Sequence, residues 1–409
     1  MNTLVDERSD VQFAPMRKRE NLDDFRAELR VWLAATVPPG WQEKMKGADT
    51  TQYVAFQRWW VSELLKVNLA TPHWPRDWGG EELSLRHQII IAEEMAKAGA
   101  PDPDLFTISF YHLPATLFGY GSPEQRERYL EGAKNGREVW CQGFSEPGAG
   151  SDLASLRTKA EHKGDVYIVN GQKIWSSYGM YADYCLLLAR TNPAAPKKQA
   201  GISYFILDMK TPGITIRPIK QITGEADFAE VFFDNVEIPV SNLIGAENEG
   251  WKIAQATLSA ERGLIVFGLI ERLALAFERD LASAKDTWLQ DDQLRREYGM
   301  LHARMRSVRL LIRQMLRETE ENPEVGGAAA LAALIKLNWA TLLNDYTLFL
   351  VRAEGIGGLH AQPSVLGGGQ NTGIRINDYL KSYGWTISGG SNEIMRNIIA
   401  ERVLGLPKA

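Results

Sequence analysis

The sequence predicts an α+β protein: an all-helical N-terminal domain, a middle antiparallel β-barrel or sandwich domain, and a four-helix-bundle-like C-terminal domain. Apolar residues recur at helical spacing from Leu22 to about Gly136 and again after Pro239. Between these stretches, short apolar segments separated by turn residues indicate strands. A chain of 409 residues is long enough for two or three domains. We place the domains at residues 1–138, 139–240 and 241–409.

The N-terminal third contains recognisable helix signals. Phe25, Leu29 and Leu33 repeat at the spacing of one helix face. Ser122-Pro123 has the composition of a helix start, because serine caps free N–H groups and proline fits the first turn.

The middle third alternates apolar segments with turn residues. Asn170-Gly171 favours the left-handed angles of a tight turn and therefore predicts a β-hairpin over residues 166–175. Four further strands are predicted at Tyr184–Ala189, Ile202–Leu207, Ile214–Ile219 and Ala229–Phe233.

Composition argues against several classes of function. The chain has 46 Lys and Arg against 51 Asp and Glu, so its net charge of -5 provides no general attraction to nucleic acids or anionic membranes. Only two cysteines occur, Cys141 and Cys185, and no Cys/His cluster has metal-ligand spacing, so neither a disulfide framework nor a metal site is predicted. Residues 1–10 lack the features of a secretory signal, and no membrane span is predicted. We therefore expect a cytoplasmic protein.

The segment from Trp140 to Ala154, WCQGFSEPGAGSDLA, is a candidate ligand loop. Its small residues let backbone N–H groups approach an anionic or carbonyl-rich ligand closely. On glycine content alone, a tight connection with Asp152 capping a turn explains the segment equally well.

A second candidate is the apolar segment Ile253–Ile270, whose charged residues are the adjacent Glu261 and Arg262. A carboxylate in a buried helix loses water, which raises its pKa and makes it a better proton acceptor near neutral pH. Buried acids are usually paired, however, and on the residues alone a structural ion pair is the favoured interpretation of Glu261.

Three segments carry a resemblance to a known family. The string GFSEPGAGSDLAS at Gly143–Ser155 closely resembles the acyl-CoA dehydrogenase signature, with Phe144 where an aliphatic residue is usual. The strings KIWSSYG at Lys173–Gly179 and GGSNEIMR at Gly389–Arg396 are similar to further segments of that family. The resemblance extends from about residue 22, and the order helices, strands, helices agrees with it.

The resemblance implies an FAD cofactor and a set of roles. Phe144 and Ser145 match positions that line the flavin ring, and Trp175 and Ser177 match residues that cover the flavin and bond near its N5. A Trp in a strand is more often a core residue, so the joint order of the motifs carries this assignment. The implied cofactor-binding residues are Gln142, Phe144, Ser145, Trp175, Ser177 and Ser391, and the implied substrate-binding residues are Ser151, in the CoA loop, Arg262 and Gly389.

The resemblance also implies which residue is the catalytic base. Most family members place a glutamate directly before the Gly-Thr or Gly-Ser of the C-terminal motif, where this chain has Gly389. The isovaleryl-CoA and long-chain branch instead places it before an arginine on the helix that opens the last domain, which matches Glu261-Arg262. Glu261 is therefore the implied base, and the backbone N–H of Gly389 can still donate to the thioester oxygen.

The implied function is dehydrogenation of an acyl-CoA to the 2,3-enoyl-CoA, with hydride transfer to flavin N5 and an electron-transfer flavoprotein as acceptor. The family's Arg-x-x-Phe-Gly stretch has no equivalent around Arg295–Met305, and its glycine-rich stretch is blurred into Val365–Asn371, so whether one chain completes the adenine side of the flavin site is left open. A homodimer, a homotetramer or a heteromer with a related chain remains open.

Two alternatives to this function stay open as well. One is a non-catalytic or half-site subunit of a heteromer, for which Gly389 is the main argument. The other is a flavin oxidase or monooxygenase on the same scaffold. The sequence does not select among straight-chain, branched, aromatic and steroid-derived thioesters.

Overall fold

The computed structural model describes residues 13–46, 48–261, 264–321, 327–362 and 372–407, with the side chains of 259–261, 264–265 and 327–329 outside the description. Contacts between residues divide the chain into two compact units. The helical unit consists of Met1–Tyr53, Leu83–Pro101 and Glu261–Ala409, and the sheet unit consists of Val54–Glu82 and Asp102–Ala260. The predicted domain boundaries stay a prediction.

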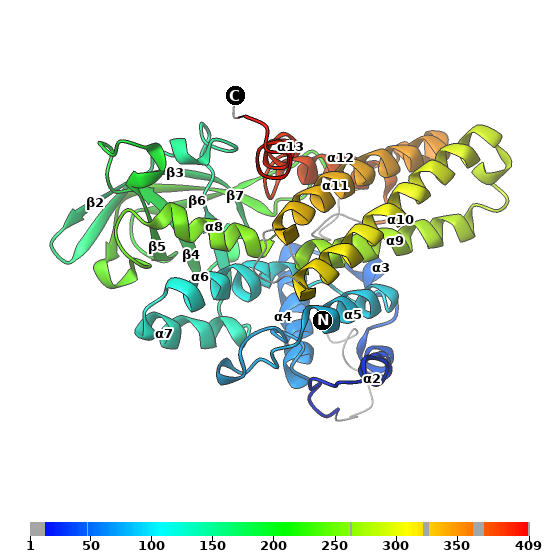
Figure 1. Ribbon diagram of the computed structural model, residues 1–409, viewed down its shortest axis with the longest axis horizontal. Coiled ribbons are helices and arrows are strands. Elements are labelled where there is room, and N and C mark those ends of the chain that lie inside the picture. The colour runs from blue at the N-terminus through cyan, green and yellow to red at the C-terminus, as the bar shows by residue number, and fades with distance from the viewer. Residues whose placement is uncertain (1–12, 47, 262–263, 322–326, 363–371, 408–409) are drawn as a thin grey trace. The chain divides into compact units, whose positions relative to one another are not determined.

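The sheet unit contains one curled sheet, drawn in green shades in Figure 1. Its order is β1-β4-β2-β3-β7-β6, with β5 beside β4. The pairs are antiparallel except where β4 runs parallel to β1 and touches β2. This architecture confirms the predicted fold class, and the parallel pair is an addition to it. The strands are β1 Trp140–Gly143, β2 Lys159–Lys163, β3 Val166–Ser177, β4 Tyr184–Arg190, β5 Ile202–Asp208, β6 Ile214–Ile219 and β7 Phe228–Pro239.

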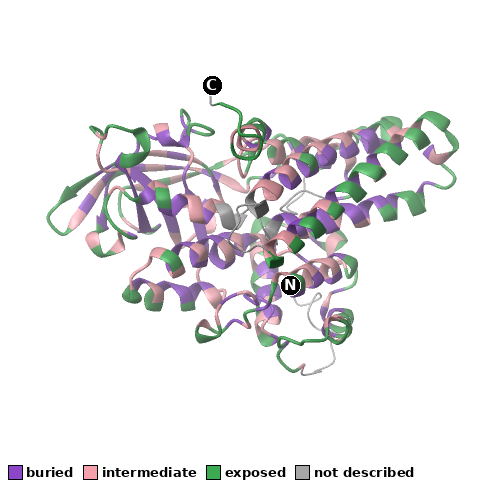
Figure 2. Cartoon of the chain, viewed as in Figure 1, coloured by how far each residue is buried: buried purple, intermediate pink, exposed green. Residues whose placement is uncertain are grey.

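Both faces of the sheet centre are buried, which explains the uninterrupted apolar runs of β4 and β5. Leu186 and Leu188 face the helices of the unit, whereas Leu187 and Ala189 face the interior formed with β3 and β7. Figure 2 shows these central strands in the buried colour. Burial of each leucine side chain stabilises the unit by about 2 kcal/mol.

The predicted hairpin at Asn170-Gly171 is wrong. Residues 166–177 form the single strand β3, and Asn170-Gly171 lies at a register shift against β7. The Asn170 amide oxygen accepts from the backbone N–H of Asn235 at 2.9 Å. A Cβ at Gly171 would lie 2.6 Å from the Thr158 hydroxyl, so this glycine permits close approach of the chain and does not form a turn.

Helices of the sheet unit cover the sheet. The start predicted at Ser122 is confirmed, because its hydroxyl accepts from the N–H of Gln125 and the Gln125 side chain accepts from the N–H of Ser122. The elements are α4 Thr50–Lys66, which crosses from the helical unit, the π-helix η3 Ile108–His112, α6 Leu113–Tyr120, α7 Pro123–Lys134 and α8 Gly250–Glu261.

The helical unit is built around four long helices, α9 to α12, which confirms the predicted helical C-terminal domain. Their core combines aliphatic and aromatic side chains, and the rings of Phe277 and Tyr346 stack with centroids 3.7 Å apart. The Tyr346 hydroxyl donates to buried Asp280, which also pairs with Arg375. The helices are α2 Leu22–Thr36, α3 Trp41–Lys46, α5 Leu85–Lys97, α9 Leu264–Ser283, α10 Asp292–Glu321, α11 Gly327–Ala353, α12 Arg375–Ile387 and α13 Asn392–Ile398.

Two kinds of feature are absent from the residues that the structure describes. None of the helices found there combines the length and the apolar content that crossing a bilayer requires. Within the same residues, no three His, Cys, Asp or Glu side chains are grouped so that they would hold a metal ion.

Candidate functional site

A buried ion pair fixes the predicted ligand loop to the sheet. Lys173 of β3 is fully buried, and its ammonium donates to the Phe144 carbonyl at 2.9 Å and to the Glu146 carboxylate at 2.8 Å. Phe144 and Glu146 lie in the loop that follows β1 directly. The Lys173 side chain therefore connects this loop to strand β3 of the sheet. The position of Phe144 is therefore set by a charged residue that it does not neighbour in sequence.

Glu146 completes the arrangement. Its carboxylate also accepts from the backbone N–H groups of Arg157 at 2.6 Å and Thr158 at 2.9 Å. Burial alone would raise the pKa of Glu146, but the Lys173 ammonium and these hydrogen bonds lower it below its ordinary value. Burial lowers the pKa of Lys173. The glutamate is thus ionised at neutral pH with all its oxygens engaged in the loop.

This pair was not among the predicted site residues. Both members lie inside the motifs that carried the family resemblance, Glu146 in GFSEPG and Lys173 in KIWSS. Each motif has a charged residue within an apolar segment, and this pattern could have indicated the pair. Charged residues in such segments are rarely buried unless they are paired.

The loop and β3 bring several predicted cofactor residues together. The backbone N–H of Ile174 donates to the Ser145 carbonyl at 2.9 Å. Ser145 and Phe144 therefore lie beside Trp175, and Ser177 follows two residues later on the same strand. The structure unites these four positions within the sheet unit.

Trp175 occupies a strained position. Its φ of 63° is left-handed, and β3 shifts register against β7 between Lys173 and Ser176. A bulge of this kind redirects a side chain, and a left-handed non-glycine residue costs about 1–2 kcal/mol. The indole is 55% exposed and meets Phe228 edge to face, so it is not the core residue that tryptophan in a strand usually is. Strain combined with an exposed aromatic ring favours a binding role.

Gln142 provides a separate test of whether the site fits a flavin. Its amide Nε2 is buried and has no hydrogen-bond partner in the protein. Buried polar groups are nearly always satisfied, so an orphaned amide beside the loop calls for a ligand acceptor. A planar ring with a polar edge supplies both that acceptor and a face for Trp175. The residues present therefore fit FAD.

Ser151 belongs to an exposed turn of the loop segment. In this turn, neighbouring Asp152 accepts from Lys198 at 2.9 Å. Lys198 also donates to Ser155 at 2.7 Å. The turn is therefore a polar surface feature with a lysine ammonium, and the role of Ser151 toward CoA stays a prediction.

Two predicted residues lie in the helical unit. Ser391 caps α13, and its hydroxyl accepts from the N–H of Ile394 at 3.3 Å. Gly389 and Gly390 have φ values of 64° and 91°, which favour glycine. Buried Lys336 donates to the Gly390 carbonyl at 2.7 Å and so holds this turn in place.

The predicted base and its neighbour fall at the limit of the described residues. Glu261 is the last residue of α8, and its side chain lies outside the description. Arg262 lies outside the described residues altogether, as does the Val365–Asn371 stretch. Within the segment predicted to be one helix, Ile253–Ile270, the described residues are helical up to Glu261 and again from Leu264.

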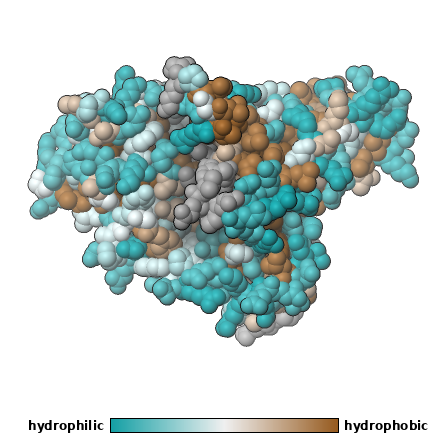
Figure 3. All heavy atoms as spheres, in the orientation of Figure 1, coloured by the Kyte–Doolittle hydropathy of each residue, from teal (hydrophilic) through white to brown (hydrophobic). Residues whose placement is uncertain are grey.

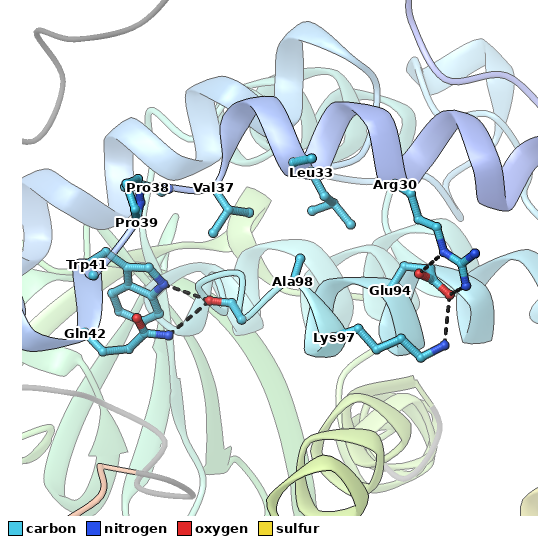
Figure 4. A pocket seen from close by; sticks show the side chains of 13 residues that line it. Arg30, Leu33, Val37, Pro38, Pro39, Trp41, Gln42, Glu94, Lys97 and Ala98 are labelled. Atoms are coloured by element: carbon cyan, nitrogen blue, oxygen red, sulfur yellow. Dashed lines mark hydrogen bonds and ion pairs between the residues drawn. The ribbon is translucent and has the colours of Figure 1, made fainter. Parts of the chain in front are cut away.

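A surface pocket of about 510 Å³ in the helical unit is unrelated to these residues (Figure 4). At one end, Trp41 and Gln42 donate to the Gly99 carbonyl at 2.7 and 3.2 Å. At the other end, Arg30 and Lys97 pair with buried Glu94. Its polar groups thus serve the packing of α2, α3 and α5, and none of the predicted site residues lines it.

Comparison with known proteins identifies the family. Models of the N-terminal, middle and C-terminal domains of acyl-CoA dehydrogenases match residues 19–137, 141–236 and 248–404. Acyl-CoA dehydrogenase IpdE1 of Mycobacterium tuberculosis is 37% identical over 398 residues, which cover 95% of this chain and 99% of that protein. The chain belongs to the acyl-CoA dehydrogenase family. It is an FAD-dependent oxidoreductase, as the resemblance implied.

Solved structures agree with this assignment. The Tcur3481-Tcur3483 steroid ACAD superposes with a TM-score of 0.81 at 29% identity, covering 96% of this chain and 100% of that one. A chain of the ChsE4-ChsE5 complex from M. tuberculosis superposes with a TM-score of 0.77 at 27% identity, covering 96% and 100%.

Replacement of Lys173 tests the ion pair. Lys173→Met leaves the buried Glu146 carboxylate without its cation and should lower the free energy of unfolding by about 3 kcal/mol at pH 7. Because the folded-state pKa of Glu146 is lowered, its stabilising contribution is present above the unfolded-state pKa and fades as pH falls through the folded-state pKa. The deficit of the variant should therefore shrink in acid. Urea unfolding at several pH values measures it, with exposed Lys163→Met as the control, and equal stability of the two variants would contradict the role.

Replacement of Trp175 separates binding from folding. Trp175→Gly relieves the left-handed backbone, so the free energy of unfolding of the flavin-free protein should stay within about 1 kcal/mol of wild type. Trp175→Gly should bind added FAD far more weakly than wild type does, and Trp175→Phe should bind it more tightly than Trp175→Gly. Absorbance near the flavin bands and urea unfolding measure the two effects. A large loss of stability with full flavin occupancy would identify Trp175 as a structural residue.

Proposed function

We propose that this enzyme oxidises an acyl-CoA thioester to the 2,3-enoyl-CoA with Glu261 as the base. The observation that carries the proposal is a paired loss and gain: Gly389 occupies the position where most family members have their glutamate, and Glu261 precedes Arg262 at the end of α8. A turn held by Lys336 with left-handed Gly389 supports a backbone role for that residue.

The residues of α8 indicate how the base would work. Ile253, Ala254 and Thr257 are fully buried along the helix that leads to Glu261. Loss of water around the Glu261 carboxylate would raise its affinity for the α-proton of the substrate. The Gly389 N–H would donate to the thioester oxygen and stabilise the charge that develops there.

FAD, when bound, accepts the β-hydrogen as hydride at N5. Gln142, Phe144, Ser145, Trp175 and Ser177 would hold the ring, and Ser391 would have the flavin-contacting role that the family resemblance implies. Ser151 and Arg262 would bind the substrate. An electron-transfer flavoprotein would take the electrons, and a cytoplasmic enzyme is the simplest expectation. The oxidase alternative has no feature of the described residues in its favour.

Two names among the structural relatives support a substrate class and an assembly. The Tcur3481-Tcur3483 protein is called a steroid ACAD, and ChsE4-ChsE5 is called a complex. We therefore propose a steroid-derived thioester as substrate and a heteromer with a related chain as the active form. In such a heteromer this chain would supply the base.

The helical unit has a surface suited to such an assembly. Tyr383 and Ile387 of α12 are exposed, as are Leu404 and Leu406 after α13. Figure 3 shows apolar atoms gathered near the end of α13. The sequence of α10 lacks the Arg-x-x-Phe-Gly stretch of the family. Flavin contacts from another chain would therefore be needed.

Glu261→Gln tests the base. The variant should retain FAD but reduce it at least ~10²-fold more slowly with acyl-CoA, because the exchange removes the proton acceptor and preserves size. Anaerobic stopped-flow bleaching of the flavin measures the rate. Glu278→Gln, an exposed glutamate on α9, is the matched control. Near-normal reduction by the Glu261 variant refutes the assignment.

Purification tests the assembly. The chain expressed alone should be pale and bind FAD weakly, whereas co-expression with a related acyl-CoA dehydrogenase chain should yield a yellow complex that acyl-CoA bleaches. Size-exclusion chromatography with absorbance detection distinguishes the forms. A yellow homomer that acyl-CoA bleaches at full rate would contradict the heteromer and leave the proposed reaction intact.

A further inference from the structure

A proline creates an unusual turn at the start of α6. Pro114 has no N–H and so cannot donate to the Phe110 carbonyl as a helical residue would. Residues Ile108–His112 form a π-helix instead, in which the Leu113 N–H reaches the Ile108 carbonyl. The freed Phe110 carbonyl accepts from Trp74 Nε1 at 2.9 Å and lies 3.2 Å from His73 Nε2. Pro114 therefore favours the π-turn, and the side chains of Trp74 and His73 contact the carbonyl that it frees. Turns of this kind are frequent at functional sites.

His112 at the end of this turn is unsatisfied. Its ring is 3% exposed, and neither Nδ1 nor Nε2 has a hydrogen-bond partner. Burial lowers the pKa of His112 to about 4, so the ring is neutral at pH 7 with one donor and one acceptor. Leaving a buried polar atom unpaired costs about 1–3 kcal/mol, and both nitrogens of this ring are unpaired, so a ligand group that pairs with one of them would be stabilising.

The register of α6 and α8 locates His112. Lys252 lies over the ring of Tyr120, and Thr257 meets Thr116 at 2.7 Å between hydroxyl oxygens. The position on α8 rises as the position on α6 falls, so the two helices are antiparallel. One further turn along each backbone sets His112 level with the last turn of α8.

A buried polar cluster links this turn to the flavin loop. The Thr116 hydroxyl donates to the His112 carbonyl at 2.8 Å, and the Tyr204 hydroxyl lies 3.4 Å from that of Thr257. The Tyr204 ring meets the Phe144 ring edge to face, with centroids 5.5 Å apart. His112 is thus connected within one compact unit to a residue predicted to line the flavin.

We propose that His112 is a specificity-determining residue that hydrogen-bonds an oxygen substituent, keto or hydroxyl, on the acyl group near the carbons that react. The inference rests on the proposed function, which supplies the acyl thioester and places the base at residue 261. An apolar acyl chain would leave both ring nitrogens unpaired, whereas an oxygenated acyl group satisfies one of them. A steroid-derived acyl group carries such oxygens, so the chemistry of His112 agrees with that substrate class.

The test compares two thioesters with the same carbon skeleton, 3-cyclohexylpropanoyl-CoA and 3-(2-oxocyclohexyl)propanoyl-CoA, on the flavin-loaded enzyme. Anaerobic bleaching gives kcat/KM, and perturbation of the flavin absorbance by the corresponding enoyl-CoA products gives Kd. Wild type should prefer the oxygenated compound at least ~10-fold in both quantities, the effect of one buried hydrogen bond.

Variants assign the preference to the ring. His112→Leu should abolish it, chiefly through Kd, and keep the plain thioester within about 3-fold of wild type. His112→Gln should retain part of the preference, and it serves as the test should the leucine variant fail to fold. His360→Leu, an exposed histidine, is the matched control and should behave as wild type.

The outcomes separate this inference from the proposed function. A wild type that bleaches with both thioesters without preference, or a His112→Leu variant that keeps the preference, overturns the role of His112 alone. A wild type that bleaches with no acyl-CoA, these two and steroid-derived ones included, overturns the proposed reaction and the inference with it.

Discussion

The candidate site depends on one buried ion pair, Lys173 with Glu146. Two charges removed from water are unfavourable unless each is fully hydrogen-bonded. Here the ammonium bonds a carbonyl and a carboxylate, and the carboxylate bonds two further N–H groups of the chain. The pair joins the loop after β1 to the middle of β3. This ion pair, with its hydrogen bonds complete, therefore fixes the positions of Phe144, Ser145 and Trp175 relative to one another.

The same unit contains a residue with a strained backbone and buried polar groups without hydrogen-bond partners. Trp175 has a strained backbone, and the Gln142 amide and the His112 ring have no partners. The start of α7 in the same unit follows the rules of local structure, with the capping box of Ser122 and Gln125. Proteins violate such rules mainly at functional sites, where a ligand supplies the missing partner. These three residues are consistent with a site built to receive a cofactor and a substrate.

Local features of the fold were predictable and long-range ones were not. The strand at Ile214–Ile219 and the helix start at Ser122 follow from periodicity and capping chemistry. The hairpin at Asn170-Gly171 failed because its glycine is required by the approach of Thr158, a contact that local turn statistics do not contain. For the site, the family motifs located Ser145 and Trp175, but the pairing of Lys173 with Glu146 across 27 residues appears only in the folded chain.

The most direct measurement is a double-mutant cycle on FAD affinity, with Lys173→Met, Glu146→Gln and the double variant titrated with FAD. If the pair holds the flavin loop, each single variant should lose at least ~10-fold in affinity, and the double variant should lose clearly less than the product of the two losses. Single variants that bind FAD as tightly as wild type, or losses that simply multiply, would show that the loop does not depend on the pair.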